Sequence, residues 1–470
     1  MRLAFFSLLA LLSIASVAHA HGRPPFLGEI AFHPTDPDVI VVRATWGLVI
    51  SDDGGETWGW SCAAVTGADP TRENPPILVT PSGAVLLGTF GGLARSSTDR
   101  CQYERPAALD GQFIIDLYAR PDDPGVVWAV ATSGVDPDSV WRSDDEGATW
   151  AMVGDPIDDI LVERVRVAPS DASRVYLSGA IPVMSIRYDG GVPDGGPTTT
   201  ERTGWLLRSD DAGETYERLE VPLLEGERNV HLLAVDPTDP DRVLVRLTKR
   251  TIDPTEERVL LTEDAGDTWT TAATGRQISG GAFSDDGSSA WVTARVVDGL
   301  FRSTDAGRSF TQVQRLSMPC LGVRGDEVWV CVDELADGYA LGRSTDAGDA
   351  LTEMLEFSEI YDLIECSRCT DVGFVCPMWY PDLAYDLRLD GGSAELPDGG
   401  VTGAPRDAGI CIEDGVDAGP GPPPMDGGMD GGTTGEPPPE GCGCRAAGGA
   451  GAGLAPWLAM AALLWTRRRG

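Results

Sequence analysis

The chain has 470 residues, of which 42% are hydrophobic, so it has enough material for a large core and more than one segment. Its formal net charge of −37 argues against a nucleic-acid partner, because phosphate backbones require a basic protein face. An acidic surface of this kind is mainly a solubility feature.

Residues 1–20 have the layout of a secretory signal peptide. Arg2 supplies the positive end, residues 3–17 form a short apolar run, and Ala18-His19-Ala20 has the small-x-small cleavage pattern. We therefore expect the chain to be exported and its 10 cysteines to be disulfide candidates rather than metal ligands.

A short pattern, Ser-x-Asp-x-Gly-x-Thr-Trp, recurs along most of the chain. Its Ser and Asp hydrogen-bond their own turn, and its Gly allows the positive φ that closes a hairpin. The final aromatic residue enters the next strand as an apolar anchor. Each copy therefore predicts a turn between two strands. The positions that carry the pattern are Ser51, Asp53, Gly55 and Trp58; Ser143, Asp145, Gly147 and Trp150; Ser209, Asp211, Gly213 and Tyr216; Asp264, Gly266 and Trp269; Ser303, Asp305, Gly307 and Phe310; and Ser344, Asp346 and Gly348.

The spacing of these copies predicts the architecture. Counting a damaged copy at Ser97, in which Cys101 replaces the glycine, they start at residues 51, 97, 143, 209, 262, 303 and 344, which is 41 to 66 residues apart. A second pattern lies between them, a Pro/Asp turn followed by a β-branched run, as in residues 31–42. Each period therefore predicts four strands, and residues 21–357 predict an all-β, seven-bladed β-propeller.

The repeat resembles the Asp-box, or bacterial neuraminidase repeat (BNR), of sialidase-like and sortilin-type β-propellers. The resemblance implies that the box is structural and far from the axis. A sialidase would also need an arginine cluster, a Tyr/Glu nucleophile pair and an acidic proton donor. The usual Arg-Ile-Pro motif is absent near the first strand, where Glu29 and His33 stand instead. We assign no catalytic residue, and we expect no cofactor and no metal.

An arginine precedes most copies of the repeat. Arg95, Arg142, Arg208, Arg302 and Arg343 share one blade-periodic position, which indicates packing between blades rather than catalysis. The face opposite the repeat turns carries the connections of variable length, the longest being residues 181–204. Variable loops on a rigid ring are where binding surfaces are normally built, although tolerated insertions would look the same.

Eight of the 10 cysteines fall into three groups. Cys320 and Cys331 flank a turn symmetrically, so a hairpin would place them opposite each other for a cross-strand disulfide. Cys62 and Cys101 follow adjacent copies of the repeat and are candidates to link two blades. The segment 358–389 contains Cys366, Cys369 and Cys376, which make four with Cys411. A small disulfide-bonded cap is favoured over a zinc or redox site, because no second Cys pair has zinc spacing.

The C-terminal part predicts export to the cell surface. Residues 390–440 are rich in Asp, Gly and Pro and read as a disordered linker. Residues 441–470 combine Cys442 and Cys444, a charge-free run at 446–465 and three terminal arginines, and so predict a transmembrane helix. They resemble the myxobacterial C-terminal sorting signal, MYXO-CTERM, which implies a sorting protease and display at the cell surface. A plain membrane anchor is the alternative.

These features leave several functions open. The first is a cell-surface binding or scaffold module for a glycan, peptide or protein, acting through the variable-loop face. The second is a glycoside hydrolase of sialidase-like or endoglucanase type, which would need two facing carboxylates that the sequence does not single out. A third resembles the photosystem II assembly-factor propellers, which bind proteins. We favour binding, because a fold alone does not confer chemistry.

Overall fold

The structure is a computed structural model, and it describes residues 23–132, 137–158, 160–180, 204–249, 256–296, 298–360 and 362–387. The predicted signal peptide, linker and C-terminal sorting segment, with Cys411, Cys442 and Cys444, lie outside these ranges. Among the described residues, no helix is long and apolar enough to cross a membrane.

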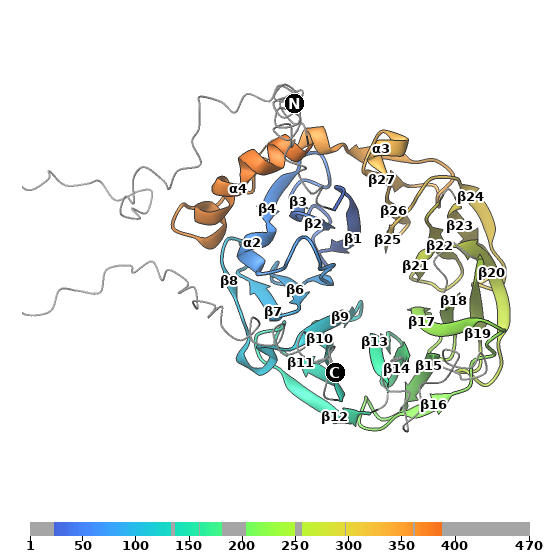
Figure 1. The fold of residues 1–470 in the computed structure, drawn as a ribbon. Coiled ribbons are helices and arrows are strands. Elements are labelled where there is room, and N and C mark those ends of the chain that lie inside the picture. Colours follow the sequence, from blue (N-terminus) through green and yellow to red (C-terminus); the bar gives the residue numbers. More distant parts are fainter. Residues whose placement is uncertain are drawn as a thin grey trace, which may run out of the picture. The chain divides into compact units, whose positions relative to one another are not determined.

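Seven antiparallel sheets confirm the predicted seven-bladed propeller (Figure 1). Each blade is one contiguous stretch of chain with its four strands in sequence order. Blade 1 contains β1 (Leu27–Phe32), β2 (Ile40–Ala44), β3 (Gly47–Ser51) and β4 (Gly59–Cys62); blade 2 contains β5 (Ile77–Val79), β6 (Val85–Thr89), β7 (Gly92–Ser96) and β8 (Tyr103–Glu104); blade 3 contains β9 (Phe113–Arg120), β10 (Asp123–Thr132), β11 (Asp138–Ser143) and β12 (Ala151–Ile157).

The remaining blades repeat this order, with short helices at some connections. Blade 4 contains β13 (Leu161–Ala168), β14 (Asp171–Ala180), β15 (Gly204–Ser209) and β16 (Glu217–Leu219); blade 5 contains β17 (Glu227–Val235), β18 (Val243–Lys249), β19 (Glu256–Thr262) and β20 (Thr270–Arg276); blade 6 contains β21 (Ile278–Phe283), β22 (Ala290–Ala294), β23 (Gly299–Ser303) and β24 (Thr311–Gln314); blade 7 contains β25 (Cys320–Arg324), β26 (Glu327–Cys331), β27 (Leu341–Ser344) and β28 (Thr352–Leu355). The helices are α2 (Ala63–Thr66), η1 (Ala107–Leu109), α3 (Glu334–Asp337), η2 (Phe357–Glu359) and α4 (Asp371–Leu387).

Each repeat motif forms the turn between the third and fourth strands of its blade. In the first copy, Ser51 Oγ donates to Asp53 Oδ1 (2.8 Å) and accepts the backbone N–H of Gly55 (2.8 Å), while Asp53 accepts the N–H and hydroxyl of Thr57. The same pattern recurs at Asp145, Asp211, Asp264 and Asp305. These bonds compensate for a backbone that runs through two successive residues of positive φ, such as 54 and 55.

A separate apolar core lies between each pair of neighbouring blades. The core between blades 1 and 2, for example, packs Val41 and Ile50 against Ile77 and Leu87. Equivalent clusters join every other neighbouring pair, including blade 7 to blade 1. The ring is therefore stabilised by face-to-face burial of β-branched and leucine side chains.

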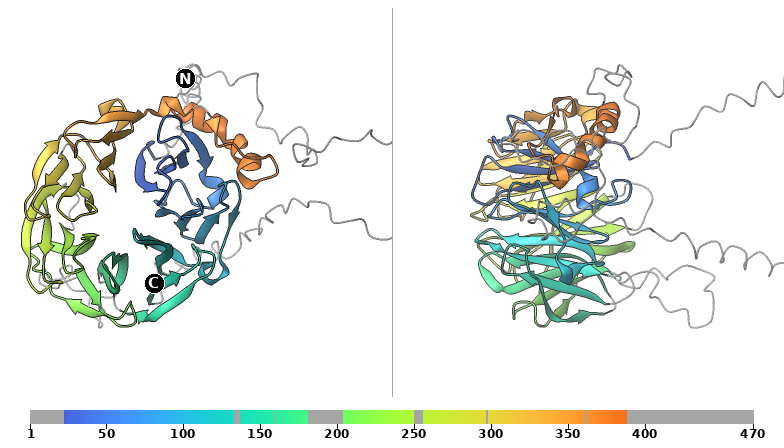
Figure 2. Two further views of the ribbon diagram at one scale, coloured as in Figure 1. Left: turned by 180° about the vertical axis from the view of Figure 1, so that it is seen from behind. Right: turned by 90° about the vertical axis from the view of Figure 1, so that its left-hand side faces the viewer.

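The C-terminal segment closes the ring from outside. After blade 7, strand β29 (Asp362–Leu363) pairs in parallel with β4, and α4 then lies along blades 1 and 2 (Figures 1 and 2). Disulfides join Cys62 to Cys376 and Cys101 to Cys366. The proposed direct link between Cys62 and Cys101 is therefore wrong, because each is bonded to this segment instead.

The hairpin cysteines behave as their spacing predicts. Cys320 and Cys331 face each other in the β25–β26 ladder and form a disulfide with a Cα–Cα distance of 5.0 Å. Cys369 is unpaired within the described part of the chain.

The ring has two different faces. The turns between first and second strands and the repeat turns lie on one face, which we call the repeat-turn face. The turns between second and third strands, and the connections between blades, lie on the other, which we call the loop face. The connections that contain residues 133–136, 181–203 and 250–255 join second to third strands, so they begin and end on the loop face.

Candidate functional site

The innermost strands, which contact one another in ring order around the axis, share an irregularity near their first residues. An extra residue interrupts the ladder with the second strand in five blades, at Gly28, Ile115, Glu163, Arg228 and Ser279. Such β-bulges re-aim the neighbouring side chains and are frequent beside functional sites. Here they lie at the loop-face end of the strands.

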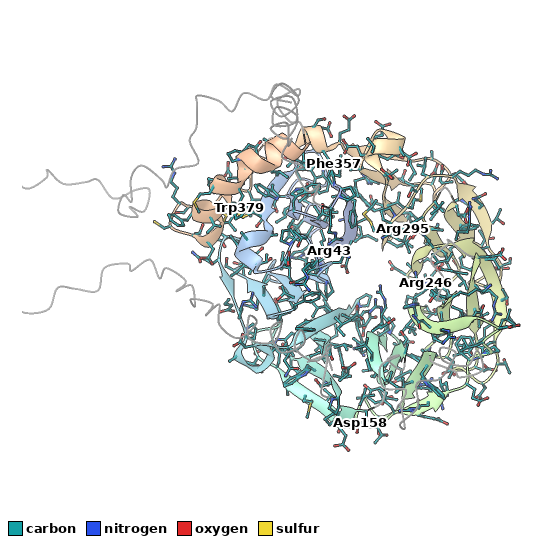
Figure 3. All side chains as sticks on the ribbon, in the orientation of Figure 1. Arg43, Asp158, Arg246, Arg295, Phe357 and Trp379 are labelled. Atoms are coloured by element: carbon teal, nitrogen blue, oxygen red, sulfur yellow. A yellow bond between two sulfur atoms is a disulfide. The ribbon has the colours of Figure 1, made fainter. Side chains whose placement is uncertain are left out.

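Charged side chains gather at these bulges. We call them the axial cluster: Glu29, Arg43, Asp116, Glu163, Arg164, Arg166, His231, Arg246, Glu257 and Arg295. Arg43, Arg246 and Arg295 lie on the inner side of the ring (Figure 3). The arginines and carboxylates that sequence analysis could not choose among therefore converge on the axis.

Blade 1 contributes an ion pair. Arg43 Nε lies 3.6 Å from Glu29 Oε2, and Arg43 is only 7% exposed. Burial raises the pKa of the Glu29 carboxyl, against the opposing effects of Arg43 and Arg164. Burial also lowers the pKa of Arg43.

Blades 3 and 4 meet through a buried carboxylate. Asp116 accepts the backbone N–H of Val165 (2.9 Å) and Nη1 of Arg166 (2.7 Å). Arg164 is only loosely paired with it, since Nη1 lies 3.9 Å from Asp116 Oδ1, and 43% of the Arg164 side chain is exposed. Arg164 is therefore a cation that remains accessible.

A histidine–carboxylate pair joins blades 4 and 5. His231 Nδ1 lies 2.7 Å from Glu163 Oε2. Burial lowers the pKa of His231 and the charge of Arg246 lowers it further, although the hydrogen bond with Glu163 acts in the opposite direction. Burial favours a higher pKa for Glu163, but the hydrogen bond from His231 and the nearby arginines hold it below its usual value.

Blades 5 and 6 contribute Arg246 and Arg295 to the axial cluster. Arg246 hydrogen-bonds the Ile278 carbonyl and lies 3.9 Å from Glu257, whose pKa is raised by burial. Burial lowers the pKa of Arg43 and Arg246, and the positive charge of Arg295 lowers both further. Arg295 itself is exposed and has no ion pair or side-chain hydrogen bond within the described ranges. The axial cluster thus holds one arginine without a counter-ion in a strongly acidic protein.

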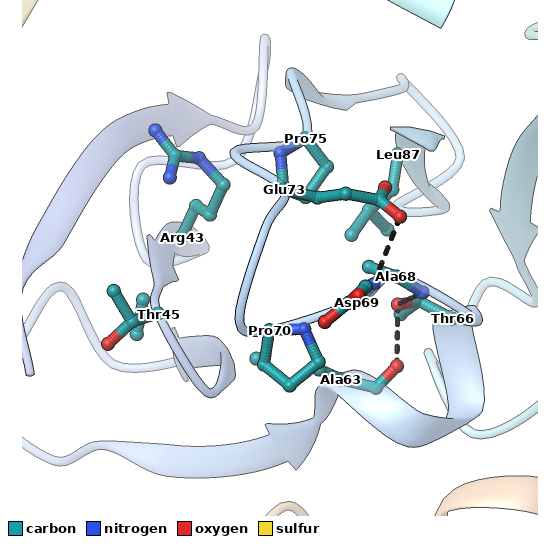
Figure 4. Close-up of a pocket in the computed structure, with 12 residues that line it drawn as sticks. Arg43, Thr45, Ala63, Thr66, Ala68, Asp69, Pro70, Glu73, Pro75 and Leu87 are labelled. Carbon is teal, nitrogen blue, oxygen red and sulfur yellow. Dashed lines mark hydrogen bonds between the residues drawn. The ribbon is translucent and has the colours of Figure 1, made fainter. Parts of the chain in front are cut away.

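The hollow beside this cluster is small. It lies between blades 1 and 2 and is lined by Arg43, Thr45, Asp69, Glu73 and Leu87, among others (Figure 4). Its volume is about 10 Å³, which is room for about one water molecule. A ligand would therefore sit on the loop face rather than inside this hollow.

An exposed aromatic pair stands on the same face. Phe90 lies in the β6–β7 turn, Phe113 is the first residue of β9, and their ring centroids are 5.1 Å apart. Both are exposed, by 46% and 38%.

The repeat residues predicted from the sequence are not part of this site. They lie on the repeat-turn face, with Trp58 and Trp150 buried and Tyr216, Trp269 and Phe310 half-buried. Glu29 reaches the axial cluster, whereas His33 accepts the N–H groups of Thr35 and Asp36 in a turn. No group of three metal-ligand side chains occurs in the part of the chain that the structure describes.

Sequence analysis did not select the other members of the axial cluster. Asp116, Arg164 and Arg246 lie in the apolar-rich innermost and second strands of their blades. A charged residue within such a strand was the available signal, since charges are rarely buried without a partner.

The comparisons agree with a propeller fold. Residues 138–295, about a third of the chain, match the model of the Sortilin-Vps10 family, described as sortilin, neurotensin receptor 3. No curated protein sequence matches the chain.

Several solved structures are similar in fold. An ancestral GH74 enzyme has a TM-score of 0.50 at 15% identity over 66% of this chain and 44% of its own. The GH74 xyloglucanase from Xanthomonas campestris has a TM-score of 0.50 at 15% identity over 72% of this chain and 55% of its own. This chain thus spans about half the length of these enzymes. YCF48 from Cyanidioschyzon merolae also matches, with a TM-score of 0.40 at 13% identity over 65% of this chain and 92% of its own. At such identities the likeness bears on the fold alone.

Proposed function

We propose that the protein is a binding module whose ligand, a glycan, peptide or protein, contacts the loop face around the axis. The observation that carries this proposal is the axial cluster. Most of its charges are paired, within one blade as in Arg43–Glu29 or between two blades as in Arg166–Asp116, whereas Arg295 has no ion pair in the described ranges. A pre-arranged set of charges with one free cation favours recognition of an anionic group.

A binding assay with a matched control tests this proposal. Glycan and peptide arrays would be probed with the wild-type protein, with Arg295→Gln and with Arg308→Gln. Arg308 is in the same blade and half-exposed, but it belongs to the repeat-turn face, where it pairs with Glu263. We expect Arg295→Gln to lose ligands that Arg308→Gln retains; equal binding by both variants to every ligand would contradict the proposal.

A glycoside hydrolase is the second candidate, and one observation favours it. Burial raises the pKa of two axial carboxyls, Glu29 and Glu257, and a raised pKa is what a general acid needs near neutral pH. Incubation with a panel of polysaccharides, followed by an assay for new reducing ends, tests this. Activity that Glu29→Gln or Glu257→Gln abolishes would make the protein an enzyme.

We also propose where the protein works. Residues 1–20 would direct export, and residues 441–470 would act as a sorting signal that a protease processes before the chain is displayed at the cell surface. The acidic segment 390–440 would then separate the propeller from the envelope, by roughly 35–40 Å if it behaves as a flexible coil.

A further inference from the structure

The exposed pair Phe90–Phe113 is a defined surface rather than two scattered side chains. Their rings lie 33° from parallel and belong to neighbouring blades. Among the described residues, the other exposed phenylalanine and tryptophan side chains, Phe374 and Trp379, lie on α4. Exposed aromatic surface beside polar groups is typical of a ligand-binding site.

Hydrogen bonds fix this pair relative to the axial cluster. The backbone N–H of Phe90 donates to Glu73 Oε2 (3.0 Å), and Glu73 is buried. The next residue, Asn74, accepts Nη1 of Arg43 through Oδ1 (3.2 Å). The turn that carries Phe90 is thus attached to the same loop that holds an axial arginine in place.

The second ring is connected to the cluster through its own strand. Phe113 and Asp116 are three residues apart in β9, which corresponds to roughly 10 Å along a strand. Asp116 is the partner of Arg164 and Arg166. Cations therefore flank the aromatic pair on both sides, Arg43 in blade 1 and Arg164 in blade 4.

We infer that the loop face binds an acidic oligosaccharide, that is, a chain of sugar units bearing carboxylates. The apolar face of one sugar ring stacks on Phe90 and Phe113. The carboxylates of the neighbouring sugar units approach Arg164 and Arg295. The separation of the cations among several blades favours a ligand with repeated charges over a single small anion. This inference rests on the proposed function and narrows it to one ligand class.

Calorimetry with a pair of matched sugars tests the inference on the full chain. The probes are a β-1,4-linked tetrasaccharide of mannuronic acid and the neutral mannose tetrasaccharide of the same linkage, with a tetraglutamate peptide as the acidic non-sugar. We expect the acidic sugar to bind about tenfold more tightly than the neutral one, with a difference that shrinks at high salt. Tetraglutamate is expected to bind more weakly than the acidic sugar, since it cannot stack.

Variants separate the aromatic pair from the cations. Phe90→Ala/Phe113→Ala should weaken binding of the acidic sugar by at least about tenfold, whereas Phe374→Ala, an exposed phenylalanine outside the face, should leave it unchanged. Equal affinity for both sugars, preference for tetraglutamate, or an unaffected double variant would overturn the inference. The arrays separate this result from failure of the proposed function. If Arg295→Gln still loses ligands on the arrays, the proposed binding function is supported and only the acidic oligosaccharide is wrong.

Discussion

Arg95 of blade 2 donates a hydrogen bond from Nε to the backbone carbonyl of Glu146, 3.1 Å away in the repeat turn of blade 3. Arg208 makes the same contact with Ala265 of blade 5 (3.1 Å), and Arg302 with Ala347 of blade 7 (3.4 Å). The accepting residue has positive φ each time, so its carbonyl is turned toward the preceding blade. At three of its five positions this periodic arginine therefore joins neighbouring blades, whereas Arg142 and Arg343 pair with carboxylates of their own blades.

Arg208→Ala should destabilise the ring without changing ligand binding. The side chain is 18% exposed and its loss leaves the Ala265 carbonyl without a donor, so we expect a cost of about 1–3 kcal/mol in the free energy of unfolding. Urea denaturation measures this. Arg142→Ala is the control, because Arg142 is more exposed and pairs locally with Asp144, and it should cost less, about 0–1 kcal/mol. Equal costs would argue against a blade-joining role.

Removing the disulfides of the C-terminal segment should cost more than removing the hairpin disulfide. Cys62–Cys376 and Cys101–Cys366 close loops of 314 and 265 residues, whereas Cys320–Cys331 closes one of 11. In the chain-entropy model a longer loop gives more stabilisation, about 5–6 kcal/mol against about 3. Thermal unfolding of Cys366→Ser/Cys101→Ser and Cys320→Ser/Cys331→Ser compares them. A larger loss from the hairpin variant would contradict this order.

The sequence was sufficient for the blades because each blade is local. The turn bonds of Asp53 and Thr57, and the pairing of Cys320 with Cys331, depend on residues close in the chain. The partner of Cys62 could not be found in this way, since Cys376 is 314 residues distant and comes near only when the ring closes.

The axial cluster could not be predicted from the sequence, for a different reason. Glu163 and Arg164 lie at a bulge, which breaks the two-residue alternation that assigns side chains to faces. Glu29 and Arg164 come from different blades, and their charges interact only around the axis. No pattern of residues close together in the chain predicts an interaction between residues of different blades.

The repeat turns should make the protein lose stability in acid. Asp305 accepts hydrogen bonds from the Oγ and N–H of Ser309 and from Ser303, and these lower its pKa from 3.8 to about 2. A carboxyl with a depressed folded pKa stabilises the fold above its unfolded pKa, and this contribution is lost as the pH falls through the folded value. Asp305→Asn should therefore be destabilised relative to wild type at pH 7, with the difference shrinking between pH 4 and pH 2.

A second variant provides the control for that measurement. In the last turn, Ala350 replaces the hydroxyl residue, so Asp346 lacks one of the bonds that Asp305 makes. Asp346→Asn should show a smaller pH-dependent difference in thermal midpoint. A constant difference from pH 7 to pH 2 for Asp305→Asn would show that the turn does not depend on the carboxylate charge.

The proposed sorting signal predicts how the C-terminus is processed. The order of acidic segment, Cys442 and Cys444, charge-free run and terminal arginines leads us to expect removal of the arginine end and display at the cell surface. Cys442→Ala/Cys444→Ala should leave full-length precursor in the inner membrane, which would be measured as loss of surface labelling together with an untrimmed C-terminus in mass spectrometry. The Cys320→Ser/Cys331→Ser variant is the control for loss of two cysteines elsewhere. If the double variant at 442 and 444 reached the surface with its C-terminal helix trimmed as in the wild type, the sorting-signal interpretation would be wrong.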